Sequence, residues 1–195
     1  MTTHSKSKAL VALVLAISIA ATGCSAQWIN IALQDLPVLT QMALNMATLV
    51  STLASGKQAN PSDTAVIQNI SGQASRDLNL LQALYNDYKA SPSADTLQKI
   101  QNVISDLNRN LPALLEAAHI SNATLTARIT AAVNLILTTV NSFASLIPRS
   151  GPVTARKMVR ALPTKSDLKK QWNQQVCAPT GNSAMDAAFA ASVLR

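Results

Sequence analysis

The stretch 39-LTQMALNMATLVSTL-53 carries its large apolar residues at alternating steps of three and four. Leu39, Met42, Met46, Leu49 and Leu53 therefore share one face of an α-helix, with the spacing of a helix that packs against other helices. We predict that this helix runs from about Trp28 to Ser55 and ends at the stop signal Gly56. Such a stripe requires partner helices, because it can be buried only against other apolar faces.

Three further runs of roughly 25 residues repeat the pattern and supply these partners. The second run carries Ile67, Ile70, Ala74, Leu78, Leu81, Tyr85 and Tyr88. The third carries Leu97, Ile100, Ile104, Leu107, Leu111, Leu114 and Ala118. The fourth carries Leu125, Ile129, Ala132, Ile136, Val140, Phe143 and Ile147.

The punctuation between the runs consists of short clusters of helix-capping and helix-breaking residues. Pro37 either kinks the first helix or marks its first turn. Pro112 either kinks the third helix or separates it from a short second piece that Asn110 caps.

The composition indicates an all-α protein, with 5 glycines, 3% aromatic residues and no strand-like alternation. Short linkers make consecutive helices antiparallel neighbours, so residues 28–148 are predicted to form an up-down-up-down four-helix bundle.

Residues 149–195 are predicted to form a basic C-terminal extension that carries one or two short helices. Leu168, Trp172 and Val176 stand at i, i+4 and i+8, which is typical of an amphipathic helix capped by Thr164 or Ser166. A last weak helix is expected from Asp186 to Leu194.

The net charge of +7 is concentrated in part of this extension. Residues 25–148 have six basic and seven acidic side chains, whereas residues 149–170 have seven basic side chains and only Asp167 against them. These seven are Arg149, Arg156, Lys157, Arg160, Lys165, Lys169 and Lys170. They predict binding to an anionic surface such as phospholipid headgroups, lipopolysaccharide phosphates or a wall polymer. The alternative is that these residues form a solvated tail that only helps solubility. Nucleic acid is the least favoured partner, because the sequence shows no aromatic stacking platform.

The N-terminus has the three parts of a secretory signal: a basic lead with Lys6 and Lys8, an apolar run, and small residues at its end. The apolar run Ala9–Ala21 has 13 residues, which is well short of the ~20 that a membrane-spanning helix needs.

The residues Ala21-Thr22-Gly23-Cys24 resemble the lipobox of bacterial lipoproteins, although Ala21 stands where Leu is commonest in that family. The resemblance implies cleavage between Gly23 and Cys24, a diacylglyceryl group on the Cys24 thiol, and acylation of the new amino terminus by a fatty acid such as palmitate. Ser25 after the Cys fits release to the outer membrane in a cell that has one. The resemblance covers the signal alone and says nothing about the mature fold.

The domain organisation that follows is a removed signal (1–23), a lipidated tether (24–27), the bundle (28–148) and the extension (149–195). The expected location is the cell envelope, on the periplasmic side of the outer membrane in a two-membrane cell. An ordinary secretory signal cut after Ala26 is the alternative. Cys177 is expected to be a half-buried apolar side chain, or an unpaired thiol if Cys24 is lipidated. If Cys24 is retained without a lipid, Cys24 and Cys177 can form a disulfide.

The chain has little that indicates catalysis or a bound cofactor. Glu116-Ala-Ala-His119 has the spacing of a bundle metal-ligand pair, but Glu116 is the only Glu of the protein. We therefore expect a non-enzymatic scaffold or binding module that meets the membrane through its lipid and meets other envelope components through its surface. The alternatives are an extracytoplasmic enzyme or metal protein that uses Glu116 and His119, and a carrier of a small apolar ligand near Ala74, Ala118 and Ala132.

Overall fold

The computed structural model describes the backbone of residues 3–147 and 162–195, and the side chains of these residues from Ile29 onward. This part of the chain is all-helical, with six α-helices and no strand. The helices are α1 (Thr3–Ser55), α2 (Pro61–Ala90), α3 (Ala94–Ala117), α4 (Ala123–Ala144), α5 (Lys165–Gln175) and α6 (Ser183–Ala191).

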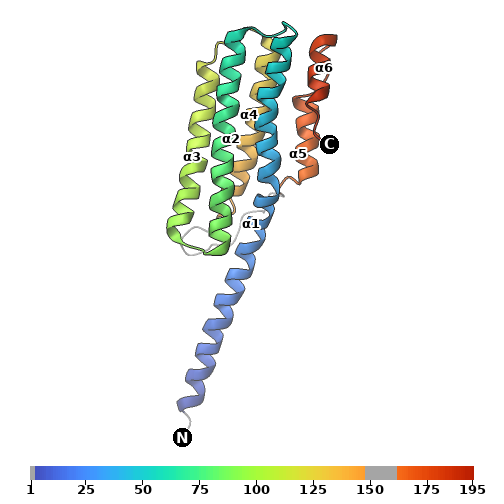
Figure 1. The fold of residues 1–195 in the computed structure, drawn as a ribbon. Coiled ribbons are helices and arrows are strands. Elements are labelled where there is room, and N and C mark those ends of the chain that lie inside the picture. The colour runs from blue at the N-terminus through green and yellow to red at the C-terminus, as the bar shows by residue number, and fades with distance from the viewer. Residues whose placement is uncertain (1–2, 148–161) are drawn as a thin grey trace.

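The four long helices lie side by side, and the short α5 and α6 cover the flank that α1 and α4 present (Figure 1). Helix α1 packs against α2, α4, α5 and α6, while α3 packs against α2 and α4. Helix α1 is therefore the common partner of most of the structure.

Side-chain caps begin the second, third and fourth helices, within the short clusters of capping residues that separate the apolar runs. Asn60 accepts a hydrogen bond from the Asp63 amide, Ser93 accepts one from Thr96, and Asn122 accepts one from Leu125. Each cap satisfies one of the backbone amides that a helix start leaves without an intrahelical partner.

The predicted apolar stripes form the core. All five residues of the opening stretch are at most 1% exposed, and so are six of the seven in the second run and most of the fourth. Tyr88, Leu97, Leu114 and Ala118, near the ends of their helices, are only partly buried and pack against the core edge.

Both prolines lie inside continuous helices, Pro37 in α1 and Pro112 in α3. The prediction that the first helix begins near Trp28 is wrong, because α1 begins at Thr3 and continues through residues 24–27. Gly23 alone does not end it, since one glycine in a helix costs only about 1 kcal/mol relative to alanine.

The N-terminal part of α1 projects beyond the other helices (Figure 1). The described core begins at Ile29 and is complete without the projecting part. A chain that starts at Ser25 therefore retains every described core residue.

The C-terminal helices are part of this core. Leu168, Trp172 and Val176 of the predicted amphipathic stripe are fully buried, and Met185 and Phe189 of α6 are buried with them. Thr164 is the cap of α5, in a reciprocal capping box with Asp167. The last helix is Ser183–Ala191, three residues earlier than expected, because Asn182 caps it.

Two helical segments, Ile29–Ser55 and Ala123–Ala144, are long and apolar enough to cross a membrane by length and composition. Core helices of soluble bundles pass the same test, and both segments bury their apolar stripes against neighbouring helices here. The test is therefore weak support for a membrane span.

Candidate functional site

Three of the seven predicted surface-binding cations lie on α5, within the described part of the chain. Lys165 and Lys170 are exposed, and Lys169 is half-buried. The other four, Arg149, Arg156, Lys157 and Arg160, lie outside the described residues. We call Lys165, Lys169 and Lys170 the α5 lysines.

The orientation of the α5 lysines follows from the apolar stripe of their helix. Leu168 and Trp172 are turned into the core, and the Trp172 Nε1 donates a hydrogen bond of 3.0 Å to the Ser192 carbonyl. Lys170 stands off that line and is exposed, whereas Lys165 stands three residues before Leu168, on the same side of the helix but in its exposed first turn.

The C-terminal end of α5 is fixed by Arg128 of α4. Its guanidinium donates to the carbonyls of Gln175 at 2.7 Å and Ala178 at 3.1 Å, and it lies 5.8 Å from the ring centre of Phe189. These carbonyls are left without intrahelical partners at a helix end, and a cation there is also favoured by the helix dipole.

The last residues of the chain are tied to the same helix. Asn173 donates to the Leu194 carbonyl at 3.0 Å and accepts from the Leu194 amide at 2.9 Å. The Lys169 ammonium donates to the Arg195 carbonyl. Lys165 and Lys170 are thus the exposed cations of α5, while Lys169 holds the chain end.

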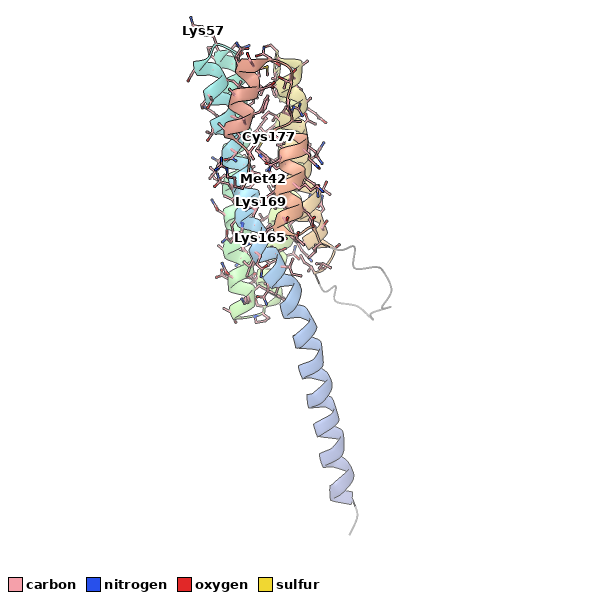
Figure 2. The ribbon with its side chains drawn as sticks, turned by 90° about the vertical axis from the view of Figure 1, so that its right-hand side faces the viewer. Met42, Lys57, Lys165, Lys169 and Cys177 are labelled. Atoms are coloured by element: carbon pink, nitrogen blue, oxygen red, sulfur yellow. The ribbon has the colours of Figure 1, made fainter. Side chains whose placement is uncertain are left out.

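Lys165 lies toward the end of the molecule from which the N-terminal part of α1 projects, and Lys57 lies at the opposite end (Figure 2). The last turn of α4 also lies toward the end that carries Lys165 (Figure 1). The described residues on either side of 148–161 thus lie toward the end from which α1 projects.

A buried carboxyl group lies near Lys165. Asp35 of α1 is only 2% exposed, and its Oδ2 atom has no hydrogen-bond partner among the described residues. Burial raises the pKa of Asp35 to about 6, and the positive charge of Lys165 acts in the opposite direction. The group is therefore mostly ionised at neutral pH and mostly neutral near pH 5.

Asp63 of α2 is the second buried carboxyl group among the described residues. Asp63 is 1% exposed and accepts hydrogen bonds from the Ser121 amide at 3.0 Å and the Ser121 hydroxyl at 2.8 Å. Spacing could have found both buried aspartates, since Asp35 is four residues before Leu39 and Asp63 is four before Ile67. Each extends an apolar stripe by one helical turn.

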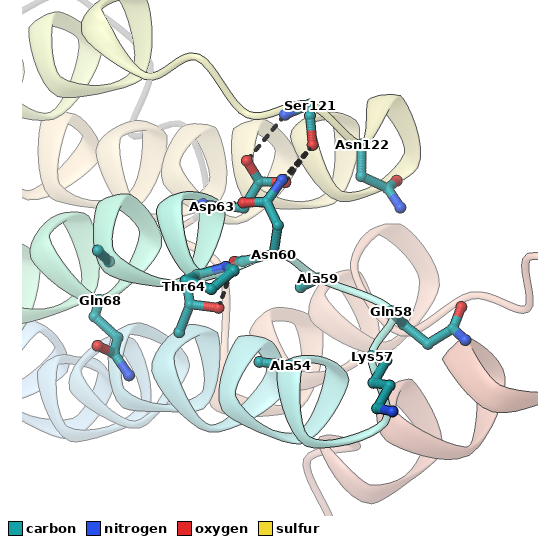
Figure 3. A pocket seen from close by; sticks show the side chains of 12 residues that line it. Ala54, Lys57, Gln58, Ala59, Asn60, Asp63, Thr64, Gln68, Ser121 and Asn122 are labelled. Atoms are coloured by element: carbon teal, nitrogen blue, oxygen red, sulfur yellow. Dashed lines mark hydrogen bonds between the residues drawn. The ribbon is translucent and has the colours of Figure 1, made fainter.

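A surface hollow of about 830 Å³ lies beside the Asp63–Ser121 pair, at the end of the molecule that carries Lys57 (Figure 3). Asn60 joins the pair, because its amide donates to the Ser121 hydroxyl at 2.7 Å. These hydrogen bonds among the three residues join the start of α2 to the connection between α3 and α4. No histidine takes part, so the pair lacks the base that activates a serine nucleophile.

The residues of the metal-protein alternative are both exposed. Glu116 lies in the last turn of α3 and His119 follows that helix, and neither side chain points into the core. No group of three or more His, Cys, Asp or Glu side chains suited to a metal ion occurs in the described ranges.

The residues of the carrier alternative are part of the packing. Ala74 and Ala132 are fully buried within the core, and Ala118 packs partly buried at its edge.

The two cysteines differ in what the structure says of them. Gly23 and Cys24 lie within α1 by their backbone, and the side chain of Cys24 lies outside the described residues. Cys177 is a free thiol, 8% exposed. Burial raises the pKa of Cys177 to about 11, so it is a protonated, weakly nucleophilic thiol at neutral pH.

Comparisons of the chain with protein-family models, with curated proteins and with solved structures found no match.

Proposed function

We propose that the protein is a lipid-anchored component of the cell envelope, a non-enzymatic helical scaffold whose basic segment, residues 149–170, binds anionic lipid surfaces. The observation that carries the proposal is the position of the exposed Lys165 toward the end of the molecule from which α1 projects (Figure 2). A cationic segment and a membrane anchor at one end of a molecule can contact the same bilayer.

The scaffold in this proposal is an up-down-up-down bundle of α1 to α4. Its support is that consecutive long helices pack against one another and that short connections join them, residues 56–60, 91–93 and 118–122. Connections of this length favour antiparallel neighbours. The covering pair α5 and α6 holds the α5 lysines on the flank of this bundle.

The anchor in this proposal is a lipid on Cys24, as the lipobox resemblance implies. Cys24 lies 11 residues before Asp35 in α1. At a rise of about 1.5 Å per residue, the anchor is roughly 16 Å along the helix from the region of Lys165. The 16 residues 149–164 that precede Lys165 are long enough to span this distance, so that their cations can reach the headgroups of the membrane that holds the anchor.

The electrostatic attraction between the cations and an anionic bilayer adds to the membrane binding that a lipid anchor provides. Each Lys or Arg near an anionic bilayer contributes about 1 kcal/mol, and this contribution falls off within a Debye length of about 8 Å. Several of the seven cations would therefore raise retention by orders of magnitude, and salt would weaken that gain.

The test is vesicle co-sedimentation of the unlipidated chain Ser25–Arg195, which retains the described core. We expect binding to vesicles of phosphatidylglycerol mixed with phosphatidylcholine that weakens with salt. Replacing Arg156, Lys157 and Arg160 with Gln should remove most of it.

The matched control is Lys57→Gln, which removes a cation at the opposite end of the molecule (Figure 2). We expect no change in binding for this variant. Equal binding of the parent chain to pure phosphatidylcholine vesicles would contradict the proposal, as would equal losses for both kinds of variant.

A further inference from the structure

The buried carboxyl group of Asp35 is the one ionisable side chain of α1 between Ile29 and Ser55. Nothing in the proposed anchoring requires a carboxyl group there. Its Oδ2 atom is buried without a hydrogen-bond partner among the described residues, which is a costly arrangement for an ionised group. Such a group calls for an explanation beyond packing.

The positive charge that acts against the raised pKa of Asp35 is that of Lys165, in the first turn of α5. The two groups form no ion pair, and Lys165 remains exposed. The Asp35 carboxylate therefore reduces the positive potential around Lys165 without occupying its ammonium group.

Other ionisable groups on the helices around α1 are engaged elsewhere or face solvent. Arg128, the ionisable residue of α4, bonds the carbonyls at the far end of α5, and Asp186 of α6 accepts from Thr180 and Gly181. On α5, Asp167 closes the capping box and Lys169 bonds the chain end. On α2, Asp63 accepts hydrogen bonds from Ser121, and Asp77 accepts one from Gln73. Tyr85 of the same helix is buried and Tyr88 is half-buried. The remaining ionisable residues of α2 are exposed: Arg76, Asp87 and Lys89.

We propose that Asp35 is a pH-dependent counter-charge of Lys165, so that its protonation strengthens attachment to anionic phospholipid surfaces. This inference rests on the proposed function and adds regulation to it. At neutral pH the ionised carboxylate offsets the positive charge of Lys165. At acidic pH the carboxyl is neutral, and the full charge of Lys165 acts on the lipid headgroups.

The experiment measures vesicle affinity of the chain Ser25–Arg195 at about pH 5 and about pH 7.5, on either side of the Asp35 transition. The vesicles contain phosphatidylglycerol and phosphatidylcholine, and the phosphatidylglycerol phosphate stays ionised at both values. One additional net positive charge near the bilayer should tighten binding about fivefold at the acidic pH, the equivalent of ~1 kcal/mol per charge.

The decisive variant is Asp35→Asn, which keeps the side-chain shape and removes the charge. We expect it to bind at both pH values with the affinity that the parent chain has at acidic pH. A pH dependence that is unchanged in this variant, or absent from the parent chain, would overturn the inference.

The matched control is His119→Gln, which removes an exposed histidine and leaves Asp35 and Lys165 in place. His119 lies close in sequence to Ser121, which bonds Asp63 in the hollow that Lys57 lines, and so lies at the end opposite Lys165. We expect its pH dependence to match that of the parent chain. Loss of the dependence in this variant would assign the effect to His119 instead.

Lys165→Gln provides a second route if Asp35→Asn fails to fold. Without the opposing positive charge, the midpoint of the pH dependence should move upward, and an unmoved midpoint would count against the inference. If the proposed function itself is wrong, the parent chain will bind these vesicles at neither pH, and this outcome is distinct from binding without pH dependence.

Discussion

At the scale of single residues, the two buried aspartates are in different situations. Asp63 accepts two hydrogen bonds from Ser121, and these compensate for the loss of hydration. Asp35 has an Oδ2 without a partner and a pKa raised to about 6. One carboxylate therefore joins two parts of the fold, and the other opposes folding when it is ionised.

The effect of Asp35 on stability has a defined sign. Its folded-state pKa lies above the ordinary value of 3.8, so the native state binds the proton more tightly than the unfolded state does. The stability that comes from the neutral form is complete below about pH 4, and it is lost as the pH rises through about 6.

We therefore expect Asp35→Asn to raise the free energy of unfolding at neutral pH by about 1–2 kcal/mol and to change it little near pH 4. Urea denaturation of the parent chain and the variant at both pH values measures the difference, and the other carboxyl groups cancel in the comparison. A variant that is less stable than the parent chain at neutral pH would contradict the assignment of the raised pKa.

At the scale of helices, the cap and stripe patterns predicted most of the architecture. Asn60, Ser93, Asn122 and Thr164 begin helices as their residue types indicate, and the apolar stripes are buried. These features are local, because a cap or a stripe is encoded within a few turns of sequence.

The features that the sequence did not reveal depend on contacts between distant segments. The contact of Arg128 with the end of α5 joins residues 47 and 50 positions apart, and no local pattern identifies it. The position of Lys165 near Asp35 likewise depends on how α5 packs against α1. The same holds for the candidate site, where the basic composition was evident and the buried counter-charge was not.

The contact between Arg128 and α5 predicts a local effect on the docking of the C-terminal helices. Arg128→Ala should lower stability by about 2 kcal/mol, and Arg128→Lys by about 1 kcal/mol, because Lys cannot reach both carbonyls with a planar fork. Hydrogen exchange should become faster in the α5 amides and remain unchanged in α2.

Arg109→Ala is the control for this experiment. Arg109 pairs with Asp106 at 2.7 Å, but both side chains are largely exposed, at 75% and 49%. Exposed pairs contribute little, so we expect a change close to zero. Unchanged exchange in α5 after Arg128→Ala would show that other contacts hold the helix in place.

At the scale of the whole molecule, the chain divides into a projecting N-terminal helix segment and a packed helical body (Figure 1). Positive charge is in excess in residues 149–170, and the end of α4 and Lys165 of α5 lie toward the projecting part. An anchored scaffold with its cations toward the membrane accounts for both features. The buried Asp35 adds a proton-sensitive element to the same end.

The measurement that tests the anchored scaffold most directly is the intact mass and N-terminal peptide of the protein from the membrane fraction, beside a Cys24→Ser variant. We expect a chain that begins at Cys24 and carries the mass of acyl groups, and a variant that loses this mass and leaves the membrane fraction. An unmodified chain that begins at Gln27 would contradict the anchor, and the basic segment would then belong to a secreted protein.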